Sequence, residues 1–222
     1  MTTHDIKNGY DKFYQNKFTS QDNWRNEPII TNPRRWISSI AEKEKGPRLI
    51  VGCGIVDMNI FQSNQEKLVG IDISKVALKK TSKIGEVVLA DVTHLPFRPS
   101  SFQSVCAFDV LEHVPNKARM MAEINITLKK GGKLFLSVPI NFGSPKGDER
   151  QPYDEPLALT QLILLIKQKF NLSIIRGFWG KNPLNFSHTP KMLITYLPYF
   201  LKHFPYLLWG STYVSLAAIK SS

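Results

Sequence analysis

Short apolar runs alternate with amphipathic stretches along most of the chain. The runs are rich in Val, Ile, Leu and Phe, which is typical of buried strands. They lie at residues 48–52, 67–71, 86–90, 104–108, 133–138, 172–177 and 213–219. Helical stretches fit between them, so the order of strand, helix and strand is repeated. This order predicts an α/β fold in which helices wrap a parallel sheet.

Three segments carry helix signals. Asn32 followed by Pro33 marks a helix start, because Asn caps helices and Pro suits the first turn, so a helix is expected over 34–43. Ser74 is a similar cap for the next helix. Between 157 and 170 the apolar residues recur at helical spacing. The first of these helices therefore precedes the first predicted strand, and the other two fall between predicted strands.

Length and composition favour one globular domain. A chain of 222 residues with 42% hydrophobic and 21% charged residues can bury a full core, and no linker or repeat divides it, so residues 1–222 are expected to form a single domain. Residues 1–18 are polar and charged, which predicts no secretory signal. Cys53 and Cys106 lie in apolar stretches without metal-type spacing. Structural thiols, no bound metal and a cytoplasmic location are expected.

The net charge of +11 is unevenly distributed. No Asp or Glu follows Glu155, whereas lysines, an arginine and many aromatic residues do. Such a surface attracts partners that are anionic and apolar. Within this region, the apolar run between Lys191 and Lys202 is too short to span a bilayer, which takes about 20 residues. The segment 181–209 is therefore interpreted as a pocket lid or subunit contact, or alternatively as a peripheral membrane contact.

Candidate chemistry begins where the first strand ends, in LIVGCGIVDMN. Gly52 and Gly54 let the backbone of this turn approach a ligand, although a tight turn alone also needs glycine. The next strand ends at Asp72, where a carboxylate can accept hydrogen bonds from both ribose hydroxyls. Together these features predict a nucleoside site. A dinucleotide-binding oxidoreductase shares them but carries a further glycine, where this chain has Ile55 to Asp57.

The third and fourth strands decide between these classes. Residues 87–114 contain VVLADVTHLPF and FDVLEHV, and RMMAEINITLKKGGKLFLSVP follows. The order and spacing of these motifs resemble the class I S-adenosylmethionine-dependent methyltransferases, in their small-molecule, type 11-like branch. The resemblance implies a doubly wound, mostly parallel, seven-stranded Rossmann-like sheet whose last strand is antiparallel. It also implies an N-terminal helical cap over 1–31 and places the insertion 181–209 before the last strand.

The same resemblance implies S-adenosyl-L-methionine as cofactor. Asp91 stands where the family hydrogen-bonds the adenine amino group, and Tyr10 belongs to a "YD" pair typical of the cap. Two positions depart from the family, since Ile50 replaces an acidic residue that helps to hold the methionine end and Val56 replaces a third glycine. A weaker hold on that end is therefore expected. The expected cofactor contacts are Tyr10, Gly52, Cys53, Gly54, Asp72, Ile73, Asp91, Val92 and Phe108.

His113 is the candidate general base. It follows the fourth strand, where family members present a residue to the acceptor, and histidine titrates near neutral pH. A histidine packed at a helix start is the alternative interpretation. Glu112 and Asp109 are neighbouring candidates, with structural or cofactor-facing roles favoured for both. A base is needed only if the acceptor arrives protonated, because the sulfonium already activates the methyl group.

The predicted function is S-adenosylmethionine-dependent methyl transfer to a small organic acceptor, for which a lipophilic compound is one option. The basic charge raises a second class, the nucleic-acid methyltransferases. Against it, FDVLEHV stands where amino-directed nucleic-acid enzymes carry an Asn/Asp-Pro-Pro-aromatic motif, and no Pro-Cys nucleophile or RNA-binding module is visible. A degenerate protein that binds the cofactor without catalysis is the third class.

Overall fold

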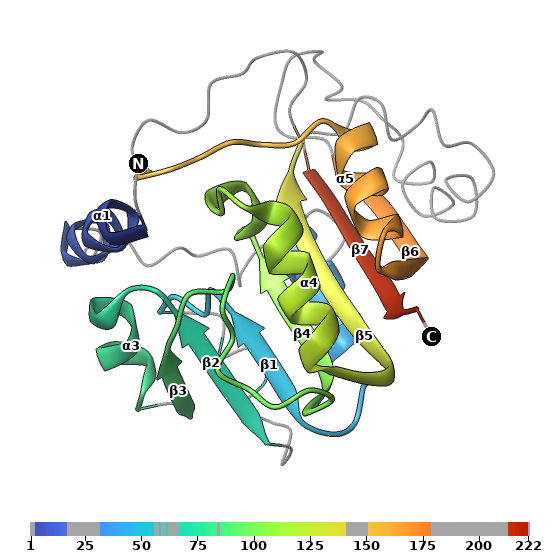
Figure 1. Ribbon diagram of the computed structural model, residues 1–222, viewed down its shortest axis with the longest axis horizontal. Helices are drawn as coiled ribbons and strands as arrows, with labels where there is room; N and C mark the ends of the chain where they lie inside the picture. Colours follow the sequence, from blue (N-terminus) through green and yellow to red (C-terminus); the bar gives the residue numbers. More distant parts are fainter. Residues whose placement is uncertain are drawn as a thin grey trace.

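A seven-stranded sheet organises the computed structural model, in the order β3-β2-β1-β4-β5-β7-β6 (Figure 1). Strands β1 to β5 run parallel, whereas β7 lies antiparallel between β5 and β6. The predicted doubly wound, mostly parallel sheet and its antiparallel last strand are thus confirmed. The strands are β1 (Arg48–Val51), β2 (Leu68–Asp72), β3 (Glu86–Leu89), β4 (Phe102–Phe108), β5 (Leu128–Pro139), β6 (Phe170–Phe178) and β7 (Tyr213–Lys220). The structure describes residues 3–16, 32–55, 58, 61, 67–83, 85–140, 151–178 and 213–221.

The helices begin where the cap signals placed them. The Asn32 side chain accepts a hydrogen bond from the backbone N–H of Arg35 at 3.0 Å, and Ser74 accepts one from Ala77 at 3.2 Å. The last helix is shorter than its apolar pattern, because Phe170 already begins β6. The described helices are α1 (Thr3–Asn16), α2 (Pro33–Ala41), α3 (Lys75–Thr81), the 3-10 turn η3 (Leu111–His113), α4 (Lys117–Thr127) and α5 (Leu159–Lys167).

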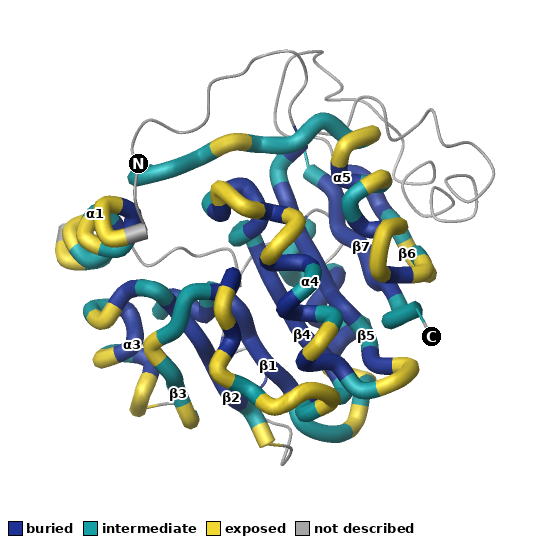
Figure 2. Tube along the Cα trace, in the orientation of Figure 1, coloured by how far each residue is buried: buried dark blue, intermediate teal, exposed yellow. Residues whose placement is uncertain are grey.

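The core consists of two apolar layers, one on each face of the sheet. In β1, Leu49 and Val51 face the layer that includes α4 and α5, whereas Ile50 faces the layer that includes α2 and α3. The same alternation in β4 sends Cys106 and Phe108 toward α2 and α3. Because both faces are covered, the central strands are buried along most of their length (Figure 2). This double cover leaves the carboxyl edge of the sheet as the place for a ligand.

Two covering segments lie at that edge. Helix α1 lies beside α3, and residues 151–158 run from α1 to α5 (Figure 1). Helix α1 is the described part of the predicted cap over 1–31. The predicted insertion 181–209 and most of the polar loop before 151 lie outside the described residues. None of the described helices is both long and apolar enough to cross a membrane.

Candidate functional site

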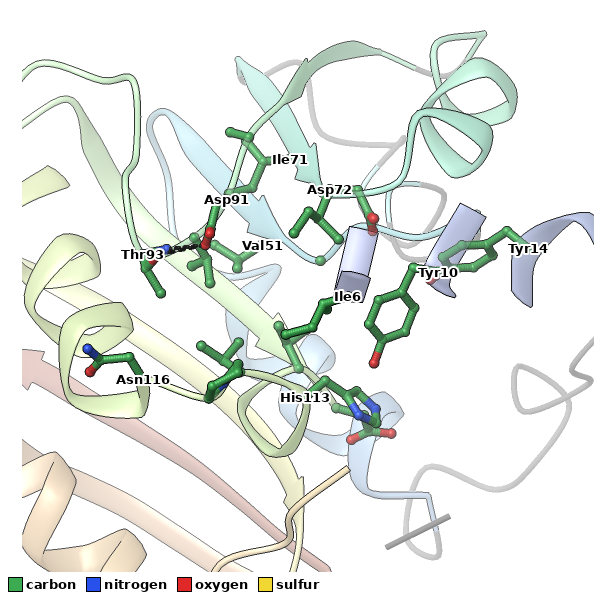
Figure 3. A pocket seen from close by; sticks show the side chains of 18 residues that line it. Ile6, Tyr10, Tyr14, Val51, Ile71, Asp72, Asp91, Thr93, His113 and Asn116 are labelled. Atoms are coloured by element: carbon green, nitrogen blue, oxygen red, sulfur yellow. Dashed lines mark hydrogen bonds between the residues drawn. The ribbon is translucent and has the colours of Figure 1, made fainter. Parts of the chain in front are cut away.

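A pocket of about 190 Å³ lies at the carboxyl edge, where β1, β2, β3 and β4 end and α1 faces them (Figure 3). This is the point where the sheet order switches from β1 to β4, the usual ligand position in a doubly wound fold. Its wall combines apolar side chains with a few polar groups. The lining residues are Ile6, Tyr10, Tyr14, Val51, Gly52, Ile71, Asp72, Ile73, Ala90, Asp91, Val92, Thr93, Asp109, Val110, His113, Val114, Pro115 and Asn116.

The turn after β1 presents backbone to this pocket. Gly52 has a φ of 59° and Gly54 a φ of 48°, in the left-handed region that favours glycine. A Cβ at Gly52 would collide with the side chain of Val110, and a Cβ at Gly54 would lie 3.0 Å from the hydroxyl oxygen of Tyr14. Both conformation and space therefore require glycine. The turn has the bare backbone that close approach to a ligand needs.

Asp72 is almost completely buried at the end of β2 and lines the pocket. Its Oδ2 accepts a hydrogen bond from the Gly54 N–H at 2.9 Å, and its Oδ1 accepts one from the Ser74 N–H at 2.8 Å. Burial raises the pKa of Asp72 to about 6, although the backbone hydrogen bonds oppose this rise. A carboxylate offers about four acceptor sites, so Asp72 can still accept a hydrogen bond from a ligand hydroxyl.

Asp91 begins the loop after β3, on the next part of the wall. Its Oδ1 accepts two hydrogen bonds from Thr93, one from the backbone N–H and one from Oγ1, both at 2.8 Å (Figure 3). These bonds fix the carboxylate while using only one of its oxygens. The second oxygen, Oδ2, is left for a donor from a ligand, and Val92 supplies apolar surface beside it.

Helix α1 covers the pocket with one face. The side chain of Asp11 attaches the helix to α3. Asp11 accepts hydrogen bonds from Ser74 Oγ at 2.6 Å and from the Val76 N–H at 3.1 Å. These donors belong to the first turn of α3, whose N–H groups have no partner inside the helix. The face toward the pocket carries Ile6, Tyr10 and Tyr14.

The same helix also packs against the segment 151–158. A Cβ at Gly9 would lie 2.7 Å from Pro152 Cβ, so the glycine permits close contact. The Tyr10 hydroxyl donates a hydrogen bond to the backbone carbonyl of Tyr153 at 3.3 Å. Burial and nearby carboxylates keep this phenol protonated, because both raise its pKa far above the usual value. Helix α1 therefore rests on two separate supports, α3 and residues 152–153.

His113 lines the pocket beside Tyr10, with their ring centroids 5.9 Å apart (Figure 3). Its Nδ1 lies 2.8 Å from the carbonyl oxygen of Tyr153. Because a carbonyl only accepts, Nδ1 must carry the proton and Nε2 the lone pair. Burial lowers the pKa of His113, which keeps the imidazole neutral at neutral pH. A neutral imidazole with a fixed tautomer is what a general base requires.

Asp109 follows β4 in a left-handed conformation, with a φ of 53°. Its Oδ2 accepts a hydrogen bond from Arg34 Nε at 2.6 Å, and its Oδ1 accepts one from Ser137 Oγ at 2.8 Å. Asp109 thus joins α2, β4 and β5 at the pocket wall. No sequence motif points to Arg34, because its partner lies 75 positions away.

Most of the residues predicted from the sequence meet in this one pocket. They come from α1, from the glycine turn after β1 and from the ends of β2 and β3. The candidate base His113 comes from η3. The predicted residues in the wall are Tyr10, Gly52, Asp72, Ile73, Asp91, Val92 and His113. Ile6, Val110 and Asn116 also line it and were missed, since single apolar or amide residues carry no motif.

Cys53, Gly54 and Phe108 are placed differently from the prediction. The Cys53 side chain is fully buried in the layer under α2 and α3, and its backbone N–H donates to the Ile71 carbonyl at 2.9 Å. Phe108 stacks on Phe61 in the same layer, with centroids 6.5 Å apart. Gly54 acts behind the wall, through its hydrogen bond to Asp72. Strand alternation explains Phe108, because toward the end of β4 Val105 and Ala107 face the layer of α4 and α5 whereas Cys106 and Phe108 face the layer of α2 and α3.

Known proteins match both the sequence and the fold. Residues 49–136 match the family model described as a methyltransferase domain. A sterol 4-C-methyltransferase of Caenorhabditis elegans is 30% identical over 118 residues, which cover 47% of this chain and 34% of that protein. An uncharacterized protein of Methanocaldococcus jannaschii is 29% identical over 134 residues, which cover 59% of this chain and 61% of that protein. The chain spans about half the length of the curated relatives it matches.

Solved structures share the whole fold at low identity. The N-methyltransferase NodS of Bradyrhizobium japonicum aligns with a TM-score of 0.67 and 10% identity, covering 96% of this chain and 100% of its own. The 1,6-didemethyltoxoflavin-N1-methyltransferase of Burkholderia thailandensis aligns with a TM-score of 0.66 and 15% identity, covering 100% and 92%. Both are complexes with S-adenosylhomocysteine. The family match and the fold agree with the resemblance seen in the sequence, since residues 49–136 match a methyltransferase domain and the sheet has the fold of the solved methyltransferases.

Proposed function

We propose that this chain binds S-adenosylmethionine in the pocket under α1 and transfers its methyl group to a small organic acceptor. One observation carries the proposal. The glycine turn, Asp72 and Asp91, which are separate in the sequence, line a single pocket within the segment that matches the methyltransferase domain. The same pocket contains His113, a group able to accept a proton.

The residues present fit the nucleoside part of this cofactor. Gly52 lines the pocket without a side chain, so a ligand can approach its backbone. Asp72 has acceptor capacity for the ribose hydroxyls, and Asp91 Oδ2 has it for an adenine amino group. Ile50, in contrast, is fully buried in the core and offers nothing to the methionine end. The fit therefore rests on the nucleoside.

The chemistry asked of the protein is mainly orientation. When bound, the sulfonium of the cofactor supplies a methyl group already activated for in-line displacement. Holding the acceptor in line contributes up to roughly 7–11 kcal/mol through lost translational and rotational freedom. Helix α1 excludes water from the site by covering it with Ile6 and Tyr10. His113 Nε2 accepts the proton that the acceptor gives up.

A labelled-cofactor screen tests the proposal. The purified protein is incubated with S-adenosylmethionine carrying an isotope in the methyl group, together with a small-metabolite extract or with total RNA. Mass spectrometry then follows the label. We expect it in a compound of low molecular mass and not in RNA. Label in RNA would show the nucleic-acid alternative to be correct, and cofactor binding without any transfer would indicate a degenerate binding protein.

The lipophilic nature of the acceptor is a separate proposal. It is supported by the apolar surface that Ile6, Val110 and Val114 give the pocket. Fractionating the extract by polarity before the labelling reaction tests it. We expect the labelled product in the apolar fractions, and a product confined to the most polar fraction would contradict this expectation.

A further inference from the structure

The loop that follows β3 fixes the Asp91 carboxylate at the pocket wall. Asp91 Oδ1 accepts hydrogen bonds from both the backbone N–H and the hydroxyl of Thr93, each at 2.8 Å (Figure 3). The bond from the N–H closes an Asx turn, in which an Asp side chain accepts from the backbone two residues on. The turn is complete with this bond alone. The hydroxyl bond is therefore additional, and it acts on the carboxylate rather than on the loop.

The contacts of the Thr93 hydroxyl fix the direction of its proton. Its oxygen Oγ1 lies 2.8 Å from Asp91 Oδ1 and 2.9 Å from His94 Nδ1. A carboxylate only accepts, and a hydroxyl has one proton to donate. Both contacts are therefore satisfied together only when Thr93 donates to Asp91 and His94 Nδ1 donates to Thr93. Successive hydrogen bonds of this kind strengthen one another. We call His94, Thr93 and Asp91, linked in this order, the donor chain.

Helix α4 supports the loop independently of the donor chain. Arg119 Nε donates to the backbone carbonyl of Thr93 at 3.1 Å, and Glu123 Oε2 accepts from the backbone N–H of Leu95 at 3.0 Å. The two α4 side chains also pair with each other at 2.7 Å. Because these bonds hold the backbone on both sides of His94, the Thr93 hydroxyl can be removed without releasing the loop.

The donor chain determines what the other oxygen of the carboxylate can bind. Within the described part of the chain, the hydrogen bonds to the Asp91 side chain all meet Oδ1, which leaves Oδ2 to a ligand in the pocket. A carboxylate oxygen accepts hydrogen bonds and cannot donate them, so it pairs with an amino group on a purine and repels the lone pairs of an oxo group at the same place. Hydrogen bonds weaken steeply when they are bent. The selectivity therefore depends on a carboxylate that keeps its direction.

We propose that Thr93 is a positioning residue that sets the base selectivity of the pocket, with His94 acting through it, so that a 6-amino purine binds and a 6-oxo purine is rejected. The inference rests on the proposed function, which assigns the nucleoside of S-adenosylmethionine to this pocket, and adds the residues that select its base. If Thr93 served only to shape the loop, losing its hydroxyl would weaken both kinds of purine equally. The ratio of the two affinities separates these roles.

The test measures this ratio with S-adenosylhomocysteine and with S-inosylhomocysteine, which carries an oxo group in place of the adenine amino group. Calorimetric titration of the wild type should show that the amino compound binds roughly 10-fold more tightly or better. Thr93→Val keeps the size of the side chain and the backbone N–H, and it should lower the ratio about 5-fold by removing the hydroxyl. Thr93→Ser retains a hydroxyl and should keep the wild-type ratio.

Two further variants separate the donor chain from general effects on the fold. Thr127→Val is the matched control, because it removes a buried hydroxyl that donates to the Ile124 carbonyl in α4, and it should leave the ratio unchanged. His94→Leu removes the outer donor from an exposed position and should lower the ratio about 2-fold. In the Thr93→Val background, His94→Leu should have no further effect, since the donor chain is already broken.

Three outcomes would overturn the inference while leaving the proposed function intact. The first is equal binding of the two compounds by the wild type, and the second is a Thr93→Val protein that loses affinity for both by the same factor. The third is an equal effect of His94→Leu with and without the Thr93 hydroxyl. If the wild type binds neither compound, the proposed function itself is contradicted, and the inference is overturned with it.

Discussion

At the scale of single residues, Asp72 connects the glycine turn, the start of α3 and the pocket. Removing its carboxylate deletes hydrogen bonds to Gly54 and Ser74 as well as the acceptor for ribose hydroxyls. Charge-assisted bonds of this kind are worth roughly 1.5–3 kcal/mol, so Asp72→Ala should weaken cofactor binding on the order of 10–100-fold. Calorimetric titration measures the change. Wild-type affinity in the variant would show that Asp72 is not the ribose partner.

The same residue predicts a pH dependence. The pKa of Asp72 is raised from 3.8 to about 6, so the folded protein prefers its protonated form. The contribution of Asp72 to folding stability is therefore greatest below 3.8 and is lost as the pH rises through about 6. Ribose hydroxyls, in contrast, prefer the ionised form. Affinity for S-adenosylhomocysteine should fall as the pH drops below about 6, and this inflection should be absent in Asp72→Ala.

His113 gives a prediction on turnover. If Nε2 accepts the proton, His113→Gln should lower turnover roughly 10²-fold or more, because Gln can still donate to the Tyr153 carbonyl but cannot act as a base. Cofactor affinity should stay nearly unchanged. Turnover of each variant is measured with an acceptor found by the labelling screen. A variant as active as the wild type would assign His113 to packing.

At the scale of elements, α1 depends on Asp11 for its attachment to α3. Asp11→Ala removes the bonds from Ser74 Oγ and the Val76 N–H, and we expect cofactor affinity to fall about 10-fold while the sheet keeps its stability. Hydrogen exchange should become faster in α1 only. Lys12→Ala, on the exposed face of the same helix, is the control. Unchanged exchange in α1 would contradict its anchoring by Asp11.

Elements fixed by local chemistry were predictable, and contacts across the fold were not. Asn32 and Ser74 cap their helices through hydrogen bonds within four residues, so the sequence contains the whole signal. The pairing of Arg34 with Asp109 depends on how α2 packs over the sheet, which no motif encodes. Phe108 was predicted as a cofactor contact from its motif alone, without asking which face of the sheet its side chain occupies. Alternation along β4 would have assigned it to the layer under α2.

At the scale of the whole molecule, the basic, aromatic C-terminal region keeps its two interpretations, because the insertion 181–209 lies outside the described residues. If the insertion contacts a membrane, anionic vesicles should recruit the protein, with about 1 kcal/mol from each nearby Lys or Arg, and salt should weaken the binding. Co-sedimentation at low and moderate salt, beside neutral vesicles, measures it. If anionic vesicles do not recruit the protein at low salt, the interpretation of the insertion as a pocket lid or subunit contact remains.

The double support of α1 has a consequence for the timing of the catalytic cycle. The Tyr153 carbonyl receives hydrogen bonds from Tyr10 on the helix and from His113 in the site. Any movement of α1 away from the pocket breaks the bond that Tyr10 donates. Wherever release of the spent cofactor requires this movement, its residence time depends on how often α1 detaches.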